Sequence, residues 1–581
     1  MTGFASTLAT IRRLAMPYFR SEDRWPGRVL LAAVIAIELM VVGITVLLNT
    51  WNARFYNALQ DRNWQSFVNE LLFFCVLAAA YIGLKVYQLY LNQWLQIRWR
   101  RWMTAQYLGD WLDGSNHYRM QLLGDAADNP DQRIADDIRQ FIELTLFIGV
   151  GLLGAIVSFF SFVVILWSLS VGPLILLGVD WAVPGYLVWV AVIYSALGTW
   201  LTHLIGRPLI ALNFNQQRYE ADFRFNLVRV RENAEQIALL DGEKAEGVRL
   251  LDRFNAVVNN WFAIMTRQKK LSFFTNGFGQ ISTIFPVVVI SPAYFAGHLQ
   301  LGGLTQTASA FGSVQQALSF FVDTYVRFAE WRAVIERLDG FERATVTARA
   351  VAITAPAIKI EQRAAGHAIR LEDLDVRLPE GARLVTADGI VIAPKDHVLV
   401  TGTSGSGKST LFRTIAGIWP FGSGTVQAPA DKKIMALPQR PYFPIGRLDA
   451  AISYPAELGS FDPSRIRELI AAVGLPKLAE RLAEEAHWNR MLSLGEQQRL
   501  GVVRAILHAP DFLLLDEATA SLDEPSEAAL YRLIQERLPA ATIISIGHRS
   551  TLRPFHSRHL ALVRDGDHHR VQDVAFASAA Q

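Results

Sequence analysis

The sequence predicts an α-helical membrane domain followed by an α/β domain that binds a nucleotide. Hydrophobic residues make up 51% of the 581 residues and charged residues only 19%, whereas soluble proteins carry about 25% charged residues. The long apolar runs are confined to residues 27–330. A glycine-rich sequence typical of phosphate-binding loops lies at residues 402–409, in the less apolar C-terminal part. These features divide the chain into an N-terminal segment (1–26), a membrane domain (27–335), a linker (336–367) and a nucleotide-binding domain (368–581).

The N-terminal segment is basic and precedes the first apolar run. Its arginines are Arg12, Arg13, Arg20 and Arg24, and no small-residue cleavage site of a signal peptide follows the run. Such a basic amphipathic stretch is typical of a helix that lies on the cytoplasmic surface of a lipid bilayer. The formal net charge of the whole chain is +3. This small charge gives no reason to expect a nucleic-acid partner.

Six stretches of the membrane domain are long and apolar enough to span a bilayer, which takes about 20 residues. The predicted spans are 27–49, 67–95, 141–168, 181–204, 272–296 and 306–328. Lysine and arginine gather in the two long segments after the second and fourth spans, and are absent from 169–180 and 297–305. Because these residues mark the cytoplasmic side, we expect the N-terminus, both long segments and the nucleotide-binding domain in the cytoplasm. The two long segments are expected to extend the spans as helices.

Three of the ionisable residues inside the predicted spans are candidates for a functional role. They are Glu38 in the first span, Lys85 in the second and Asp323 in the sixth. Ionisable groups in a membrane are costly and often lie on a substrate pathway. The alternative is that Glu38 and Lys85 pair within the bundle, or that Lys85 extends toward the interface.

The phosphate-binding loop (P-loop) directly follows a short β-like run, Asp396–Thr401. Its glycines allow backbone N–H groups to surround phosphate oxygens, and the helix expected after it directs its N-terminal dipole at the same phosphates. Lys408 is expected to contact the β- and γ-phosphates, and Ser409 to bind Mg²⁺. The predicted nucleotide-binding residues of this loop are Gly402, Thr403, Ser404, Gly405, Ser406, Gly407, Lys408, Ser409 and Thr410.

A second motif, Phe512–Glu517, has the pattern of a buried parallel strand that ends in two carboxylates. Asp516 is expected to bind Mg²⁺. Glu517 is placed to orient or deprotonate the attacking water.

The segment Leu492–Arg499 resembles the signature motif of ABC transporters. Three further features agree with that family: Gln439 follows a strand as the Q-loop does, Ser521–Asp523 follows Glu517 as the D-loop does, and His548 follows a strand as the switch histidine does. The resemblance implies an exporter-like ABC fold with a P-loop ATPase domain that uses ATP and Mg²⁺.

The same resemblance implies the role of each motif. Glu517 would be the catalytic base, His548 would contact the γ-phosphate, and Gln439 would link Mg²⁺ and water to the membrane domain. Ser493 and Gly495 of one chain would contact the ATP held by the P-loop of the other, at the seam between the two chains, and Asp523 is a further predicted nucleotide-binding residue. Because the chain has one P-loop and one signature, two chains are needed, and a homodimer is the simplest assembly.

Two departures from the family pattern are visible. The common signature is Leu-Ser-Gly-Gly-Gln, whereas this chain has Leu494 and Glu496 at the third and fifth positions. Residues 351–400 contain no aromatic residue, although the family stacks adenine on one in this region. Leu378 or a neighbour is the expected substitute.

The membrane half is similar to the SbmA/BacA-type peptide-uptake proteins and, more distantly, to the peroxisomal fatty-acyl ABC half-transporters. The segments that carry this similarity are 128–134, 221–225 and 229–235. It implies uptake of hydrophilic cargo, notably peptides, across a bacterial inner membrane. Two alternatives stay open: an exporter of lipid or fatty-acyl substrates, which predicts a cavity with apolar walls, and a membrane sensor that uses ATP without transport.

Overall fold

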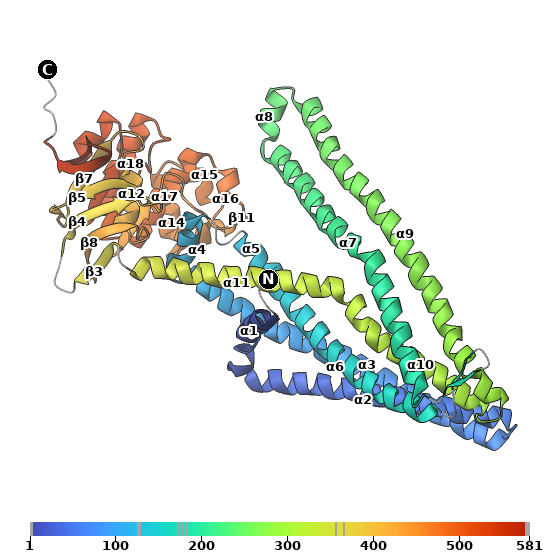
Figure 1. Ribbon diagram of the computed structural model, residues 1–581. Coiled ribbons are helices and arrows are strands. Elements are labelled where there is room, and N and C mark those ends of the chain that lie inside the picture. The colour runs from blue at the N-terminus through green and yellow to red at the C-terminus, as the bar shows by residue number, and fades with distance from the viewer. Residues whose placement is uncertain are drawn as a thin grey trace. The chain divides into compact units, whose positions relative to one another are not determined.

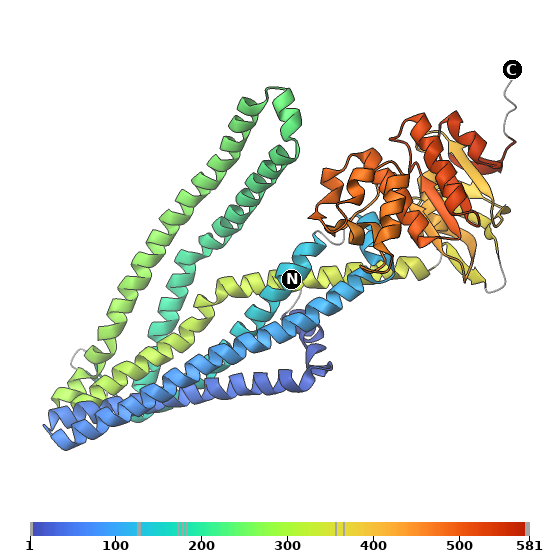
Figure 2. The same cartoon turned by 180° about the vertical axis from the view of Figure 1, so that it is seen from behind.

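The computed structural model describes residues 4–124, 129–170, 174–176, 179–181, 183–354, 357–363 and 367–575. The chain forms two compact units (Figures 1 and 2). The first comprises Met1–Leu108 and Asn129–Asp339, and the second comprises Gly109–Asp128 and Gly340–Gln581. This division groups residues 109–124 with the C-terminal unit, whereas the sequence-based boundaries place them in the membrane domain. Within the predicted linker 336–367, α11 continues to Ile353 and β3 spans Lys359–Arg363.

The first unit is helical. Its elements are α1 (Phe4–Ala15), η1 (Tyr18–Arg20), α2 (Arg24–Gln60), α3 (Trp64–Leu112), α5 (Pro130–Gln132), η3 (Arg133–Asp137), α6 (Ile138–Leu169), the short strands β1 (Leu174–Leu176) and β2 (Val179–Trp181), α7 (Tyr186–Glu232), α8 (Ala234–Leu239), α9 (Glu243–Phe295), α10 (Leu301–Asp323) and α11 (Tyr325–Ile353), of which α3 and α11 continue into the second unit. In Figure 1, α7 and α9 run side by side as a long hairpin closed by α8.

Five helical segments in the described residues are long and apolar enough to cross a membrane. They overlap the first five predicted spans, although the fourth prediction starts at 181, before α7 begins at Tyr186, and the fifth ends at 296, one residue beyond α9. The sixth prediction, 306–328, is less exact, because α10 ends at Asp323 and α11 begins at Tyr325. Segment α10 does not reach the apolarity of the other five. It nevertheless packs on α2, α6, α7 and α9 as a central helix of the unit.

Glu38 of the first predicted span and Lys85 of the second pair with each other. Lys85 Nζ lies 3.5 Å from Glu38 Oε2, and Gln88 Nε2 donates to the same oxygen at 2.5 Å. A Cβ on Gly154 of α6 would lie 2.3 Å from Glu38 Oε1, so the glycine makes room for the carboxylate. These contacts agree with pairing inside the bundle. The side chain of Asp323 lies outside the described residues.

The segment Asn129–Ile134, which carries part of the similarity described above, leads into a buried ionic cluster. Asn129 adopts a left-handed conformation (φ 54°) and Pro130 begins the helix α5, as expected for a proline at the first helical position. One turn later Asp137, 1% exposed, accepts hydrogen bonds from Arg133 (2.8 Å) and from two nitrogens of Arg337 (2.7 and 2.9 Å). The cluster joins the start of α6 to α11.

The N-terminal segment is anchored on α3. Tyr18 is fully buried and its ring stacks on Trp99 with 5.5 Å between centroids. Its hydroxyl donates to Asp23, which also pairs with Arg98. Burial raises the pKa of Tyr18, and the nearby Asp23 carboxylate raises it further, so the hydroxyl stays protonated. Gly27 allows the close approach, because a Cβ there would lie 2.8 Å from the tyrosine ring.

The second unit contains a mixed sheet and the helices that cover it. Its strands are β3 (Lys359–Arg363), β4 (Ile369–Arg377), β5 (Arg383–Ala387), β6 (Ile390–Ile392), β7 (His397–Gly402), β8 (Gly422–Pro429), β9 (Ile434–Leu437), β12 (Phe512–Asp516), β13 (Thr542–Ile546), β14 (Arg558–Asp565) and β15 (His568–Asp573), with β10 (Gly446–Arg447) and β11 (Glu485–Ala486) as a separate pair. Its helices are η2 (Asp113–Ser115), α4 (Asn116–Leu123), α12 (Lys408–Ile415), α13 (Leu448–Ser453), α14 (Pro463–Ala472), α15 (Pro476–Ala479), α16 (Trp488–Met491), α17 (Leu494–His508), α18 (Glu524–Arg537) and η4 (Ser550–Phe555).

The strand order is β3-β8-β4-β5-β15-β14-β7-β13-β12-β9, and β7, β13, β12 and β9 are parallel. These strands read as continuous apolar runs, which is typical of parallel strands buried on both faces. Leu513, Leu514 and Leu515 of β12 have no solvent exposure. Four loops therefore follow the carboxyl ends of adjacent strands at one edge of the sheet, the edge at which α/β sheets bind ligands.

The short helix α4 packs on the sheet unit although it precedes the third span in the sequence. Leu122 contacts the apolar core formed by the β-sheet and α12. Thr345 Oγ1 of α11 lies 3.7 Å from the Met120 sulfur, and Arg349 of α11 donates to Asp110 and Asp113. The long segment between the second and third spans is thus part of the nucleotide-binding unit over residues 109–124.

A buried histidine makes the stability of this unit depend on pH. His556 is 6% exposed; its Nδ1 lies 2.7 Å from the Leu552 carbonyl and its Nε2 lies 2.8 Å from Ser545 Oγ. Burial lowers its pKa to about 4, against about 6.5 in the unfolded chain. The unfolded state therefore binds the proton first, and stability is lost as pH falls from about 6.5 to 4, by about 1.4 kcal/mol at pH 5.5.

We expect His556→Asn to weaken this dependence. The measurement is the midpoint of thermal unfolding of the full chain at pH 7.5 and pH 5.5, and the difference between the two midpoints should be smaller in the variant than in the natural sequence. The same substitution at the exposed His367 is the matched control. Equal pH dependence in His556→Asn and the natural chain would contradict the assignment.

Candidate nucleotide-binding site

Four loops at one sheet edge bring the predicted site residues together. The P-loop follows β7, Gln439 follows β9, Asp516 and Glu517 end β12, and His548 follows β13. Because β7–β13–β12–β9 are hydrogen-bonded neighbours, residues separated by more than a hundred positions lie side by side.

The P-loop conformation depends on its glycines. Gly405 and Gly407 have φ values of 78° and 91°, in the left-handed region that favours glycine. A Cβ on Gly407 would lie 2.5 Å from Val385 Cγ2. The hydroxyl of Ser406 is fully buried and has no hydrogen-bond partner among the described residues. This tight cradle and its unsatisfied polar atom fit a polar ligand such as a phosphate group.

Lys408 lies inside this cradle. Its Nζ donates to the carbonyl oxygens of Gly402 and Thr403, at 2.9 Å each. Burial lowers the pKa of Lys408, and the carboxylates of Glu517 and Asp516 act in the opposite direction. The phosphates of a nucleotide would restore a full positive charge there, since an opposite charge favours the ionised form.

Ser409 and Asp516 lie side by side and could bind a divalent cation together. Ser409 Oγ donates to Asp516 Oδ1 at 2.9 Å. Burial raises the pKa of Asp516, and the Ser409 hydrogen bond opposes that shift. A hydroxyl and a carboxylate are oxygen ligands of the kind that Mg²⁺ prefers. When bound, the cation would neutralise charge on the phosphate oxygens.

Glu517 is flanked by the other two predicted catalytic residues. Gln439 Nε2 donates to Glu517 Oε2 at 3.3 Å, and His548 Nε2 lies 3.5 Å from Glu517 Oε1. Glu517 itself has φ 49°, an uncommon conformation for a residue with a side chain and one often found at functional sites. Gln439 and His548 thus both lie at the Glu517 carboxylate.

The signature residues lie at the N-terminus of α17. Ser493 caps this helix, and Glu496 completes a capping box. Glu496 Oε2 accepts from the Ser493 N–H at 2.9 Å and from the Ser493 hydroxyl at 2.8 Å. In the described part of the chain no hydrogen bond joins Ser493 or Gly495 to the P-loop of the same chain. Asp523 occupies the N-cap position of α18, at the end of the D-loop, and its side chain makes no capping hydrogen bond.

Glu496, which stands where the common signature has glutamine, is expected to weaken the binding of ATP. Its negative charge lies beside the serine hydroxyl, where it would repel a phosphate approaching Ser493. Glutamine also satisfies a capping box, so Glu496→Gln should keep the helix start and lower the KM for ATP about threefold to tenfold, with kcat nearly unchanged. Steady-state ATPase kinetics at two ionic strengths checks this, and an unchanged KM would contradict it.

Two residues that sequence reasoning missed hold these loops in place. Gln498 on α17 bonds to backbone groups of Gln439 and Ser521, and Arg549 bonds to the carbonyls of Ala520 and Leu522. The available signal was their position in the sequence, because Gln498 lies within the signature segment and Arg549 directly follows the switch histidine.

Leu378, the expected adenine contact, lies in the turn between β4 and β5. It is partly buried against the core that includes α12. The neighbouring Leu384 approaches Gly407, since a Cβ on that glycine would lie 2.8 Å from Leu384 Cγ. The start of β5, which follows this turn, is therefore close to the P-loop.

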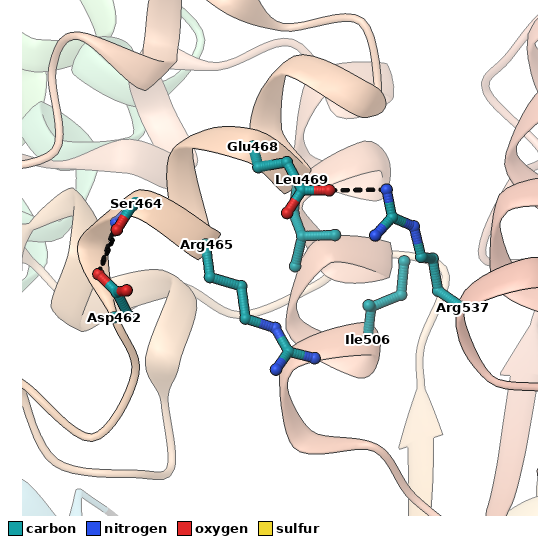
Figure 3. A pocket seen from close by; sticks show the side chains of 7 residues that line it. All are labelled: Asp462, Ser464, Arg465, Glu468, Leu469, Ile506 and Arg537. Atoms are coloured by element: carbon teal, nitrogen blue, oxygen red, sulfur yellow. Dashed lines mark hydrogen bonds and ion pairs between the residues drawn. The ribbon is translucent and has the colours of Figure 1, made fainter.

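A polar hollow on the same unit is separate from this site. It has a volume of about 420 Å³, and Figure 3 shows Arg537 paired with Glu468 on one side and Ser464 bonded to Asp462 on the other. None of the motif residues lines it. We assign it no part in nucleotide binding.

Comparison with known proteins identifies the family. The family model described as "ABC transporter transmembrane region 2" matches residues 14–295, and the model "ABC transporter" matches residues 389–520. The chain is 34% identical over 546 residues to the inner membrane ABC transporter ATP-binding protein YddA of Escherichia coli, covering 92% of this chain and 94% of that protein. The chain belongs to the ABC transporter family.

Two further similarities place this ABC transporter more closely. It is 33% identical over 618 residues to the chloroplastic ABC transporter D family member 2 of Arabidopsis thaliana, covering 95% of this chain and 85% of that protein. Its fold matches the structure of a bacterial Atm1-family ABC exporter with ATP bound, with a TM-score of 0.71, 16% identity and coverage of 93% and 94%.

Several predictions are settled by these similarities. This ABC transporter has the exporter fold, is a multi-pass membrane protein, and couples hydrolysis of ATP, with Mg²⁺, to transport. Half-transporters of the family function as dimers. The SbmA/BacA-type resemblance is not supported, and none of the relatives named here is described as a peptide transporter.

Proposed function

We propose that this chain is one subunit of a homodimeric exporter in a bacterial inner membrane, which moves an amphipathic solute of the lipid or fatty-acyl class. Its ATPase domain would lie in the cytoplasm. The observation that carries the cargo class is a groove between α7 and α9, about 640 Å³ in volume. The residues that line it are Ile205, Lys269, Lys270, Phe273, Phe274, Gly277, Phe278 and Ile281.

The groove fits such a cargo by its chemistry. Its wall is apolar, and its only charged lining residues are Lys269 and Lys270. Apolar walls would bind an acyl chain through burial of apolar surface, and the two ammonium groups would pair with an anionic head group. A hydrophilic peptide would leave the phenylalanine rings without apolar contacts. This favours the lipid or fatty-acyl alternative over peptide uptake.

In the proposed cycle each chain supplies half of two ATP sites. Lys408 would hold the β- and γ-phosphates, and Ser409 with Asp516 would hold Mg²⁺. Glu517 would take the proton of the attacking water while Gln439 orients that water. His548 would contact the γ-phosphate. Ser493 and Gly495 of the other chain would close the site from the opposite side, so that hydrolysis reopens the dimer and resets the membrane unit.

Reconstituted vesicles with ATP on one face test this proposal. We expect a labelled single-chain anionic amphiphile to move away from the ATP side, and Phe273→Ala to slow that movement severalfold. The matched control is Phe295→Ala, because Phe295 lies on the same helix and is as exposed (84% against 85%) but is outside the groove. Movement of a labelled peptide toward the ATP side would instead support import, and ATP hydrolysis without any movement would support a sensor.

A further inference from the structure

The backbone of the D-loop is held by side chains from two other elements. Arg549 donates to the carbonyl of Ala520 at 2.9 Å and to that of Leu522 at 2.6 Å. The Ser521 N–H between them donates to Gln498 Oε1 at 3.0 Å. The peptide groups of three consecutive residues, 520–522, are thus each held by a side chain from another element.

Gln498 connects the D-loop to the Q-loop. Its amide nitrogen donates to the Gln439 carbonyl at 3.0 Å while its amide oxygen accepts from Ser521. The side chain is 1% exposed, so neither half of the amide has water as a substitute partner. A shift of Gln439 must therefore move the D-loop or break a buried hydrogen bond.

Arg549 connects the D-loop to the switch loop. It directly follows His548, and its guanidinium lies 3.6 Å from Glu527, which is 2% exposed. Glu527 also accepts from Thr519 at 2.7 Å and from Thr551 at 3.1 Å. These contacts fix the guanidinium, whose planar fork suits two carbonyl acceptors at once.

We propose that Gln498 and Arg549 are positioning residues that form a clamp on the D-loop and thereby couple the two ATP sites of the dimer. Gln439 and His548 sense the nucleotide of their own chain, and the clamp passes their positions to a loop at the seam with the other chain. Occupancy of one site then adjusts the geometry of the second. This inference rests on the two-chain sites of the proposed function.

Two substitutions break the clamp selectively. Gln498→Glu keeps the acceptor for the Ser521 N–H but replaces the donor to the Gln439 carbonyl by an oxygen. Arg549→Lys keeps a positive charge near Glu527 but lacks the planar fork that contacts both D-loop carbonyls. We expect ATP binding to stay within about twofold, kcat to fall about tenfold or more, and the Hill coefficient for ATP to fall toward 1 in both variants.

The control is Gln535→Glu, since Gln535 also donates an amide hydrogen to a backbone carbonyl, that of Phe555, but contacts none of the three loops. It should leave the Hill coefficient as in the natural chain. A lower kcat with an unchanged Hill coefficient in the clamp variants would overturn the inference, as would an unchanged kcat. If the natural dimer itself shows no ATP-dependent trapping of nucleotide, that result would contradict the two-chain ATP site of the proposed function and not the role of the clamp.

Discussion

Glu517→Gln is expected to reduce ATP hydrolysis by about 10²- to 10⁴-fold, the usual contribution of a general base. The carboxylate lies between Gln439 and His548, at 3.3 and 3.5 Å, at the end of the strand that also carries Asp516. Glutamine has the same shape and accepts a hydrogen bond, but it does not take up the proton of the attacking water. ATP binding should therefore persist while turnover is lost.

The measurement is the ATPase rate of the full chain in vesicles, beside equilibrium binding of a fluorescent ATP analogue. The control is Glu524→Gln, because Glu524 lies in the first turn of α18, outside the loops that form the site. It should leave the rate within about twofold. Near-normal turnover in Glu517→Gln would contradict the assignment of Glu517 as the catalytic base.

Asp137→Ala is expected to destabilise the membrane unit by roughly 2–4 kcal/mol. The aspartate is almost fully buried and bonds to Arg133 and Arg337, whose side chains are 11% and 36% exposed. Removing one member of a buried ionic cluster leaves charge without a partner, which costs about 3–5 kcal/mol for a fully buried pair. The partial exposure of Arg337 reduces that cost. The Asp137 carboxylate also raises the pKa of Arg337.

Thermal unfolding in detergent checks this prediction. Glu143→Ala is the matched control on the adjoining helix α6, because Glu143 pairs with Arg139 in an exposed contact (43% and 40% exposed) and such pairs contribute about 0–1 kcal/mol. The double variant Asp137→Leu with Arg337→Leu should recover part of the loss, since it removes both charges. Equal unfolding midpoints for Asp137→Ala and Glu143→Ala would contradict the role given to the cluster.

The nucleotide site was predictable because its chemistry is carried by short sequences at the ends of strands. The strands β7, β9, β12 and β13 were expected from apolar runs, and parallel pairing brings their carboxyl ends to one edge. The clamp residues Gln498 and Arg549 were not predictable in the same way. Their partners are backbone groups of distant loops, and a sequence motif does not reveal which peptide group a side chain contacts.

The membrane half was predicted less completely. Hydropathy locates spans, but residues 109–124 were assigned to the membrane domain although they pack with the ATPase domain. The left-handed Gly114 and Ser115, with φ values of 53° and 67°, end the long helix there, and only the tertiary contacts of Leu122 show where the next helix docks. The peptide cargo was inferred from segments that were predicted to be cytoplasmic, whereas the proposed lipid or fatty-acyl cargo rests on residues that line the groove, such as Phe273 and Lys270.

Mixed dimers test the central claim, that each ATP site is built from two chains, most directly. Lys408→Ala disables a P-loop, and Ser493→Asp keeps a good helix cap while placing a negative charge at the signature. With the two substitutions on different chains, the two-chain account predicts one intact site and trapping of nucleotide with vanadate. With both on the same chain beside a natural partner, it predicts no intact site and no trapping. The reverse pattern would show that each ATP site lies within a single chain.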